Sequence, residues 1–229
     1  YALRIEARKM RRNGTSVRVG IYSKPWSFFL FSDGIRQRRS EALQSEGEYN
    51  LDLAQFFVRR ILGKAPDYFK PTIEIPVEVK ALNDAKEHLS QIGIESGKPF
   101  TLFHPGMRGS ALNLSPNQYL ELIGKAEKQW SDTVVLSIGP VLRDAEIAET
   151  ILKAKPYLKV VRNVDVSVLK EIFRLAKIVV APSTGPLHLA HYVGTRTIGL
   201  YPPVKTQNTT RWAPWGGSGF STVYFPKVR

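Results

Sequence analysis

The alternation of short apolar segments with helix-like segments after residue 98 is the feature that most constrains this fold. The apolar segments predict strands at 100–104, 133–138, 158–162, 178–181 and 197–201. The segments between them predict helices at 116–130, 143–155 and 187–193, and a further helix that is capped by Asp165 or Ser167 and ends at Ala176. Apolar strands that alternate with helices are typical of a parallel sheet covered on both faces. The predicted fold class is therefore α/β with a doubly wound parallel sheet, whose ligands bind beyond the carboxyl ends of the strands.

The first part of the chain is less regular and strongly basic. Its patterns predict helices at 2–12, 51–62 and 78–92, a strand at 17–21 and a Pro-containing loop at 66–76. The net charge of the whole chain is +13. Residues 1–39 hold ten basic residues against two acidic ones, a net charge of +8. Two basic clusters, at 8–12 and 36–39, flank an aromatic stretch at 25–31.

Two interpretations of this basic region remain open. Basic groups beside exposed aromatic side chains can bind nucleic acid, or an anionic membrane and its phosphates. Alternatively, the region is a solvated basic helix followed by a buried strand at 25–31. No apolar stretch approaches the ~18 residues needed to span a membrane.

Several kinds of chemistry find no support in the sequence. The chain has no Cys, which excludes disulfides and thiolate metal sites. It has neither a Walker A loop nor a G-x-S-x-G nucleophile motif. His188 and His191 are spaced i, i+3 without a nearby carboxylate, so we predict no metal site.

One motif, at 182–188, predicts an anion site. Gly185 lets the backbone approach a ligand, and Pro186 suits the first turn of a helix. The hydroxyls of Ser183 and Thr184, the helix amino end and His188 would together favour a phosphate group. The alternative is an ordinary helix cap with His188 packed in the core.

The loop that follows the strand at 100–104 is the second candidate binding segment. Its glycines can wrap a diphosphate, and its arginine can pair with one. The candidate binding residues are Gly106, Met107, Arg108, Gly109, Ser110 and Asn113. A long surface turn is the alternative.

These segments resemble glycosyltransferase family 9, the ADP-heptose–lipopolysaccharide heptosyltransferases and their relatives. The resemblance rests on His104-Pro105-Gly106 with Gly109-Ser110-Ala111 and Asn113, on Ser183-Thr184-Gly185-Pro186-Leu187-His188-Leu189-Ala190, on Arg211-Trp212-Ala213-Pro214-Trp215-Gly216, and on Glu48-Tyr49-Asn50-Leu51-Asp52-Leu53. It implies a GT-B architecture of two Rossmann-like domains. The expected division is 1–75 as the tail of an N-terminal acceptor-side domain, 76–97 as linker and helix, and 98–229 as the nucleotide-sugar-binding domain.

The resemblance also implies a function. It indicates an inverting, metal-independent glycosyltransferase that moves a sugar, with heptose as one option, from a nucleotide-diphosphate sugar to a lipopolysaccharide-type or other anionic glycolipid. No cofactor is expected, and an ADP-linked donor is one option. The expected location is the bacterial cytoplasm, with peripheral attachment to the inner membrane left open.

The catalytic base stays unassigned. The resemblance places it on an Asp in the first β–α loop of the N-terminal domain, which we expect upstream of Tyr1. A catalytically silent, nucleotide-binding relative or fragment is therefore the main alternative. A nucleic-acid-binding α/β protein is disfavoured because the basic residues are spread along the chain and no known nucleic-acid motif is present.

Overall fold

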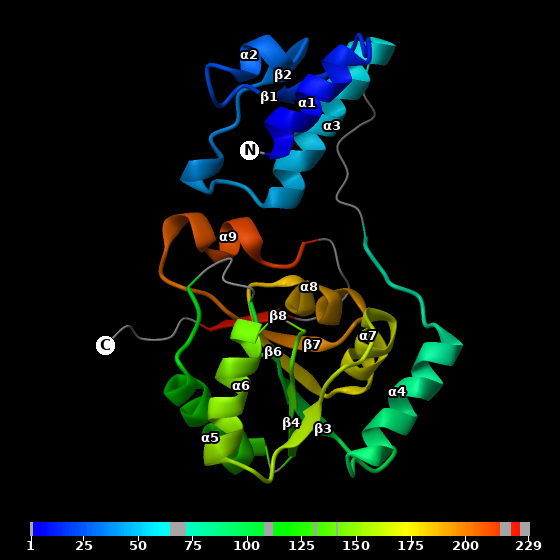
Figure 1. Cartoon of the computed structure of the whole chain (residues 1–229), viewed down its shortest axis with the longest axis vertical. Coiled ribbons are helices and arrows are strands. Elements are labelled where there is room, and N and C mark those ends of the chain that lie inside the picture. Colours follow the sequence, from blue (N-terminus) through cyan, green and yellow to red (C-terminus); the bar gives the residue numbers. More distant parts are fainter. Residues whose placement is uncertain are drawn as a thin grey trace. The chain divides into compact units, whose positions relative to one another are not determined.

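The structure is a computed structural model that describes residues 2–64, 72–107, 112–130, 132–140, 142–215 and 221–224. It divides into two compact units (Figure 1). Unit 1 comprises 1–70 together with 210–212, and unit 2 comprises 71–209 and 213–229.

Unit 2 is built on a six-stranded sheet in the order β5-β4-β3-β6-β7-β8. The strands are β3 (Phe100–Phe103), β4 (Thr133–Ser137), β5 (Lys159–Val161), β6 (Ile178–Pro182), β7 (Arg196–Leu200) and β8 (Ser221–Tyr224). All neighbouring pairs are parallel. The predicted parallel sheet is confirmed, and its edge strand β8 was not predicted.

Helices cover both faces of this sheet, as the doubly wound prediction requires (Figure 1). They are α4 (Val79–Gln91), α5 (Pro116–Trp130), α6 (Leu142–Ala154), α7 (Val166–Leu175) and α8 (Gly185–Tyr192). Buried residues of α5 and α6 share one core cluster with the sheet, whereas those of α4, α7 and α8 share the other.

Side chains of successive strand residues pack into one or the other of these two clusters. Phe100 and Leu102 of β3 pack into the cluster with α4, α7 and α8, while Phe103 packs into the cluster with α5 and α6. Ile178 and Val179 divide in the same way along β6. Because successive strand side chains point to opposite faces, a strand that is apolar throughout must be buried on both sides.

A buried acidic residue of α7 forms a hydrogen bond with the backbone at the start of α4. Glu171 of α7 is completely buried and accepts from the backbone N–H of Glu78 at 3.1 Å and from Arg174 Nε at 2.8 Å. Arg174 also donates to the carbonyls of Ile75 and Val193. The residues that lead into α4 are therefore bound to α7 by a charged network as well as by apolar packing.

Unit 1 is smaller and less layered. It contains α1 (Ala2–Arg12), β1 (Val19–Ile21), α2 (Ser27–Leu30), β2 (Asp33–Ile35), a 3-10 turn η1 (Arg39–Glu41) and α3 (Glu46–Leu62). β1 and β2 pair in parallel. Gly20 leaves room for the ring of Phe31, since a Cβ there would lie 2.4 Å from that ring.

The helix predicted at 51–62 begins five residues earlier, as α3. Ser45 caps it by accepting from the N–H of Glu48 at 3.1 Å, and Glu48 accepts in return from the N–H of Ser45 at 2.8 Å. This reciprocal capping box satisfies two backbone donors at the helix start. The Ser-x-x-Glu pattern was present in the sequence, and it could have given the correct boundary.

The buried strand considered at 25–31 is wrong. Residues 27–30 form the one-turn helix α2, in which Leu30 is buried but Phe28 and Phe29 are 49% and 75% exposed. The turn is fixed by side-chain bonds to its backbone: Ser27 Oγ donates to the Lys24 carbonyl at 2.5 Å, and Arg18 Nε donates to the Leu30 carbonyl at 2.9 Å. These polar contacts override the strand preference of the phenylalanines.

A late segment of the chain belongs to unit 1. Arg211, in the short helix α9 (Thr209–Trp212), donates through Nε to Glu46 at 2.5 Å. Glu46 also accepts from Arg39 at 2.7 Å, and Arg39 donates to Asn50 at 3.0 Å. One carboxylate at the start of α3 thus joins two arginines from distant parts of the sequence.

Candidate functional site

The two predicted binding segments follow neighbouring strands. β3 lies between β4 and β6, and Phe103 near its end pairs with Val180 of β6. The segment after β3 leads to α5 on one face, whereas the segment after β6 leads to α8 on the other. This is the point where strand order reverses, and ligands of open α/β sheets bind there.

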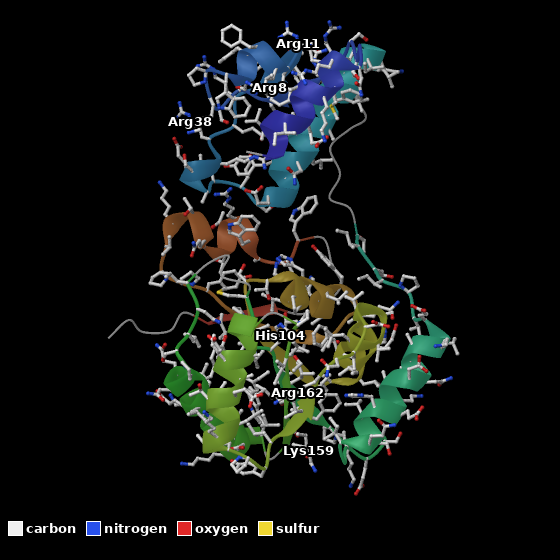
Figure 2. All side chains as sticks on the ribbon, viewed as in Figure 1. Arg8, Arg11, Arg38, His104, Lys159 and Arg162 are labelled. Carbon is white, nitrogen blue, oxygen red and sulfur yellow. The ribbon has the colours of Figure 1, made fainter. Side chains whose placement is uncertain are left out.

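A buried polar pair lies at this edge of the sheet. The Nδ1 of His104, which follows β3, lies 2.8 Å from the Oγ of Ser137, the last residue of β4. Both side chains are buried, and His104 lies at the carboxyl end of the sheet while Lys159 lies near the other end (Figure 2). Ser137 was not among the predicted site residues, although its place as a polar residue at the end of an apolar strand was an available signal.

Asn113 holds together the two ends of the loop after β3. Its Nδ2 donates to the Pro105 carbonyl at 2.7 Å, and its Oδ1 accepts from the Tyr119 hydroxyl and the Leu114 N–H, each at 2.8 Å. These bonds use both ends of the amide group. The structure therefore gives Asn113 a role in fixing the loop, and its predicted contact with a ligand stays a prediction.

Gly106 and Met107 are buried immediately after His104. Arg108, Gly109 and Ser110 lie outside the described residues. At the far end of the loop, the Leu112 N–H donates to Gln207 of the 3-10 turn η2 (Lys205–Gln207) at 3.3 Å. The segment after β7 thereby reaches the loop after β3.

Thr184, the cap residue at the amino end of α8, makes no side-chain cap hydrogen bond to the helix. Thr184 occupies the cap position in extended geometry, but its hydroxyl donates to the Pro182 carbonyl at 3.2 Å instead of accepting from the helix. Pro186 stands in the first turn, as predicted. Uncapped N–H groups at a helix start attract an anion through their partial positive charge.

Ser183 lies beside the buried Tyr201, which follows β7. Burial raises the pKa of Tyr201 to about 12, and the hydrogen bond with Ser183 partly opposes that rise in pKa. Gly199 makes room for this ring, since a Cβ there would lie 2.6 Å from it. Tyr201 therefore stays neutral at physiological pH. Its hydrogen bond with Ser183 connects it to the segment after β6.

His188 lies one turn into α8. Burial lowers its pKa below 6.5, and the neighbouring His191 lowers this pKa further. Its imidazole is consequently neutral at pH 7 and offers one N–H donor. The backbone N–H of His188 bonds to the Thr184 carbonyl at 3.3 Å, so both residues belong to the same first turn.

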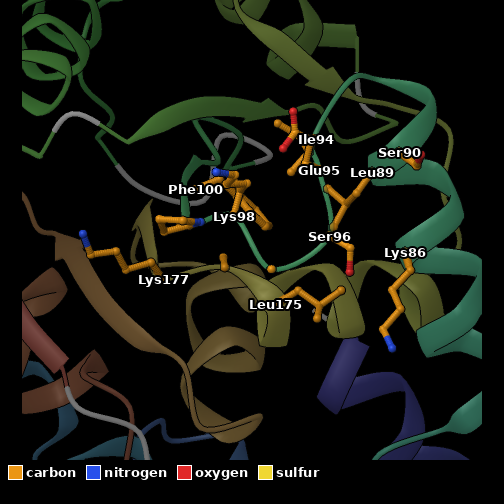
Figure 3. A pocket seen from close by; sticks show the side chains of 13 residues that line it. Lys86, Leu89, Ser90, Ile94, Glu95, Ser96, Lys98, Phe100, Leu175 and Lys177 are labelled. Atoms are coloured by element: carbon orange, nitrogen blue, oxygen red, sulfur yellow. The ribbon is translucent and has the colours of Figure 1, made fainter.

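A separate pocket of about 310 Å³ opens at the opposite edge of the sheet (Figure 3). Its apolar lining includes Phe100, at the start of β3, and Leu175, at the end of α7. Lys86 and Lys98 also line it. None of the predicted site residues does, so this pocket is not part of the candidate site.

Within the described ranges, no group of three or more His, Asp or Glu residues is arranged to hold a metal ion. No described helix has both the length and the apolar character required to cross a membrane.

Comparison with known proteins decides the family. The model of "Glycosyltransferase family 9 (heptosyltransferase)" matches residues 46–219, which is well over half of the chain. The chain belongs to glycosyltransferase family 9. A Haemophilus influenzae protein assigned as a glycosyltransferase is 30% identical over 211 residues, covering 89% of this chain and 58% of that protein.

Solved family 9 structures share the fold. A family 9 glycosyl transferase from Veillonella parvula matches 96% of this chain and 59% of its own, with a TM-score of 0.71 and 14% identity. The E. coli ADP-heptose lps heptosyltransferase II matches 95% of this chain and 64% of its own, with a TM-score of 0.67 and 21% identity. The predicted GT-B type α/β fold is confirmed, and this family 9 chain spans about three fifths of the length of these relatives.

Proposed function

We propose that unit 2 binds a nucleoside diphosphate sugar and that the family 9 protein transfers its sugar, with inversion and without a metal ion, to a hydroxyl of an anionic glycolipid. The donor would lie at the carboxyl ends of β3 and β6. An E. coli heptosyltransferase solved with ADP, similar to this chain with a TM-score of 0.55, supports an ADP-linked donor and heptose as the sugar. A lipopolysaccharide-type acceptor is supported by the likeness to the E. coli ADP-heptose lps heptosyltransferase II.

The observation that carries this proposal is the uncapped amino end of α8 beside the loop after β3. In the transfer, the acceptor oxygen bonds to the anomeric carbon while the bond from that carbon to the diphosphate breaks. The diphosphate leaves with the electron pair, and the acceptor proton passes to a base. The N–H groups of α8 and the Ser183 hydroxyl would stabilise the charge that develops on the leaving group, together with the Thr184 hydroxyl once it turns from the Pro182 carbonyl to the phosphate.

The remaining predicted residues take supporting places in this proposal. Arg108 would pair with the diphosphate, and Gly106, Gly109 and Ser110 would let the backbone wrap it. Met107 and Asn113 would shape the loop. His188, being neutral, would donate one hydrogen bond to a phosphate oxygen without adding charge.

Nucleotide titration tests the proposal directly. ADP should raise the melting temperature of the protein by mass action, more than UDP, GDP or CDP does. Thr184→Val should weaken ADP binding about tenfold, since a hydrogen bond to a charged group contributes ~1.5–3 kcal/mol. Thr150→Val is the matched control, because the Thr150 hydroxyl donates to the Glu146 carbonyl on α6, away from the candidate site. Equal ADP affinity for both variants and the parent would place the donor elsewhere.

The alternative of a silent nucleotide-binding relative makes a different prediction. It requires the same ADP binding without release of nucleotide from a nucleotide sugar in the presence of a glycolipid acceptor. A turnover assay beside the titration separates the two.

A further inference from the structure

A buried hydrogen bond between His104 and Ser137 lies at the carboxyl edge of the sheet in unit 2. Ser137, which ends β4, is 2% exposed, and its Oγ lies 2.8 Å from Nδ1 of His104, which is 5% exposed. Within the part of the chain that the structure describes, the Ser137 hydroxyl makes no other hydrogen bond. Because an unpaired buried hydroxyl is costly, Ser137 depends on this imidazole.

This dependence selects one tautomer of the His104 imidazole. If Nδ1 carried a proton, in either the neutral or the charged ring, it would donate to Oγ of Ser137, and the hydroxyl proton would be buried without an acceptor. If the hydroxyl instead donates to Nδ1, both groups are satisfied, and the proton of the neutral ring resides on Nε2. Ser137 thus makes the far edge of the ring a hydrogen-bond donor.

The alternation of strand side chains places this ring on the face of the sheet that α8 covers. Leu102 of β3 and Val135 of β4 point into the core cluster that contains the buried residues of α4, α7 and α8. His104 and Ser137 each follow two residues later, and side chains two residues apart share a face. The pairing continues to His104, whose N–H donates to the Val180 carbonyl at 2.9 Å.

The edge of the ring that carries Nε2 is directed toward β6. Nδ1 contacts Ser137 of β4, so Nε2, on the opposite edge of the ring, is turned away from β4, and the other neighbour of β3 is β6. β6 leads through Ser183 and Thr184 into the amino end of α8. Figure 2 shows His104 at this carboxyl edge of the sheet. The Nε2–H therefore lies on the side of the ring that is nearer to the proposed phosphate site.

We infer that Ser137 is a positioning residue, which holds His104 as the Nε2–H tautomer so that His104 donates a hydrogen bond to a phosphate oxygen of the nucleotide. The inference rests on the proposed function, because it requires a diphosphate at the amino end of α8. A neutral donor of fixed orientation adds to the helix N–H groups without adding charge. Ser137 acts on the nucleotide through the imidazole and does not touch the nucleotide.

Two substitutions of His104 separate this role from a purely structural one. His104→Asn keeps an amide group in place of Nδ1 as a partner for Ser137, but it has no N–H in place of Nε2. ADP affinity should fall about tenfold, as expected for one hydrogen bond to a charged group, while adenosine affinity stays unchanged. His104→Gln keeps an N–H near Nε2 and gives up the bond to Ser137, and its loss should be smaller. The reverse order of the two losses would overturn the inference.

Substitutions of Ser137 test whether it acts through His104. Ser137→Ala should lower ADP affinity about fivefold, and Ser137→Thr, which keeps a hydroxyl, should bind within about twofold of the parent. In the His104→Asn background, Ser137→Ala should cause no further loss. Additive losses, or equal ADP affinity of Ser137→Ala and the parent, would overturn the inference.

Thr195→Val is the matched control for a lost buried hydroxyl. The Thr195 hydroxyl donates to the Phe173 carbonyl at 2.7 Å, and Thr195 is buried in unit 2. Its removal should lower the melting temperature about as much as Ser137→Ala does and leave ADP affinity unchanged. A similar loss of ADP affinity in this control would mean that Ser137→Ala acts through stability alone, which would overturn the inference.

The tautomer can be measured without any nucleotide. In nitrogen-15 spectra of protein labelled at its four histidines, the His104 signals, assigned by their absence in His104→Asn, should show the proton on Nε2. A proton on Nδ1 would overturn the inference even if ADP binds. No ADP binding by the parent would refute the proposed nucleotide site and with it the phosphate contact. Equal ADP binding by the parent, Ser137→Ala and His104→Asn would refute this inference alone.

Discussion

Unit 2 and unit 1 use different interactions to hold their elements together. Unit 2 buries apolar side chains on both faces of a continuous parallel sheet, and its buried ion network adds to that core. Unit 1 has a two-stranded sheet of three-residue strands, and arginine side chains bind its carbonyls and carboxylates. A parallel pair that short is not stable by packing alone. In the described part of unit 1, hydrogen bonds and ion pairs of polar side chains therefore supplement a smaller set of buried apolar residues.

The largest expected effect is in unit 2, at Glu171. Glu171→Ala leaves Arg174 without its carboxylate partner and the Glu78 N–H without an acceptor, so we expect a loss of about 3–5 kcal/mol in the free energy of unfolding. Urea denaturation measures it, and hydrogen exchange should localise the loss to unit 2. Glu121→Ala, in an exposed pair with Lys125, should change stability by less than about 0.5 kcal/mol. Similar losses for both variants would show that the buried network contributes no more to the free energy of unfolding than an exposed ion pair does.

The corresponding test in unit 1 is Glu46→Ala. It removes the shared partner of Arg39 and Arg211, and we expect a loss of about 1–3 kcal/mol. Faster hydrogen exchange should appear in peptides from 39–62 but not in peptides from the strands of unit 2. Glu41→Ala is the control, because its pair with Arg38 at 3.5 Å is exposed. Equal acceleration in the strands of unit 2 would contradict the assignment of this network to unit 1.

Acidification should act on unit 2 through His188. Its pKa is lowered in the folded state, so the unfolded chain binds more protons in the range just below pH 6.5. This contribution to stability is complete above that pH, and it is lost as the pH falls through the lower, folded-state pKa. Urea midpoints measured across this range for the parent and for His188→Gln should differ in slope. Parallel slopes would show that His188 is not the titrating group.

The smallest expected effect is at Thr101 in β3. Its hydroxyl is buried with no hydrogen-bond partner among the described residues. Thr101→Val keeps the shape and removes the unsatisfied polar group, so stability should rise by up to about 1 kcal/mol. A thermal melt measures this change. A clear decrease in melting temperature would mean that the hydroxyl has a partner in solution.

How far the sequence could predict the structure also differs between the units. In unit 2, apolar runs such as 133–137 and the Ser115–Pro116 helix start predict their elements closely, because local pattern and burial agree. In unit 1, the aromatic run at 25–31 suggested a strand, yet Arg18 and Ser27 fix it as a helical turn. The bond from Arg18 to the Leu30 carbonyl joins residues 12 positions apart, and such a bond leaves no periodic trace in a sequence.

In the candidate site, too, some features follow from local sequence and others depend on contacts between distant residues. The glycines and hydroxyls of the two segments could be selected from their motif, since phosphate binding has a known local chemistry. The roles of Asn113 as a loop tie and of Ser137 as the partner of His104 depend on strand order, which places β3 next to both β4 and β6.

Residues 210–212 belong to unit 1, although they lie late in the chain, and this affects how a chimera with a related protein must be built. A chimera that joins unit 1 of one protein to unit 2 of another has three junctions, at 70/71, 209/210 and 212/213. A single crossover near residue 70 would pair Glu46 from one parent with the position of Arg211 from the other. An exchange of unit 2 of this chain is therefore discontinuous, and the 210–212 segment should come from the same parent as unit 1.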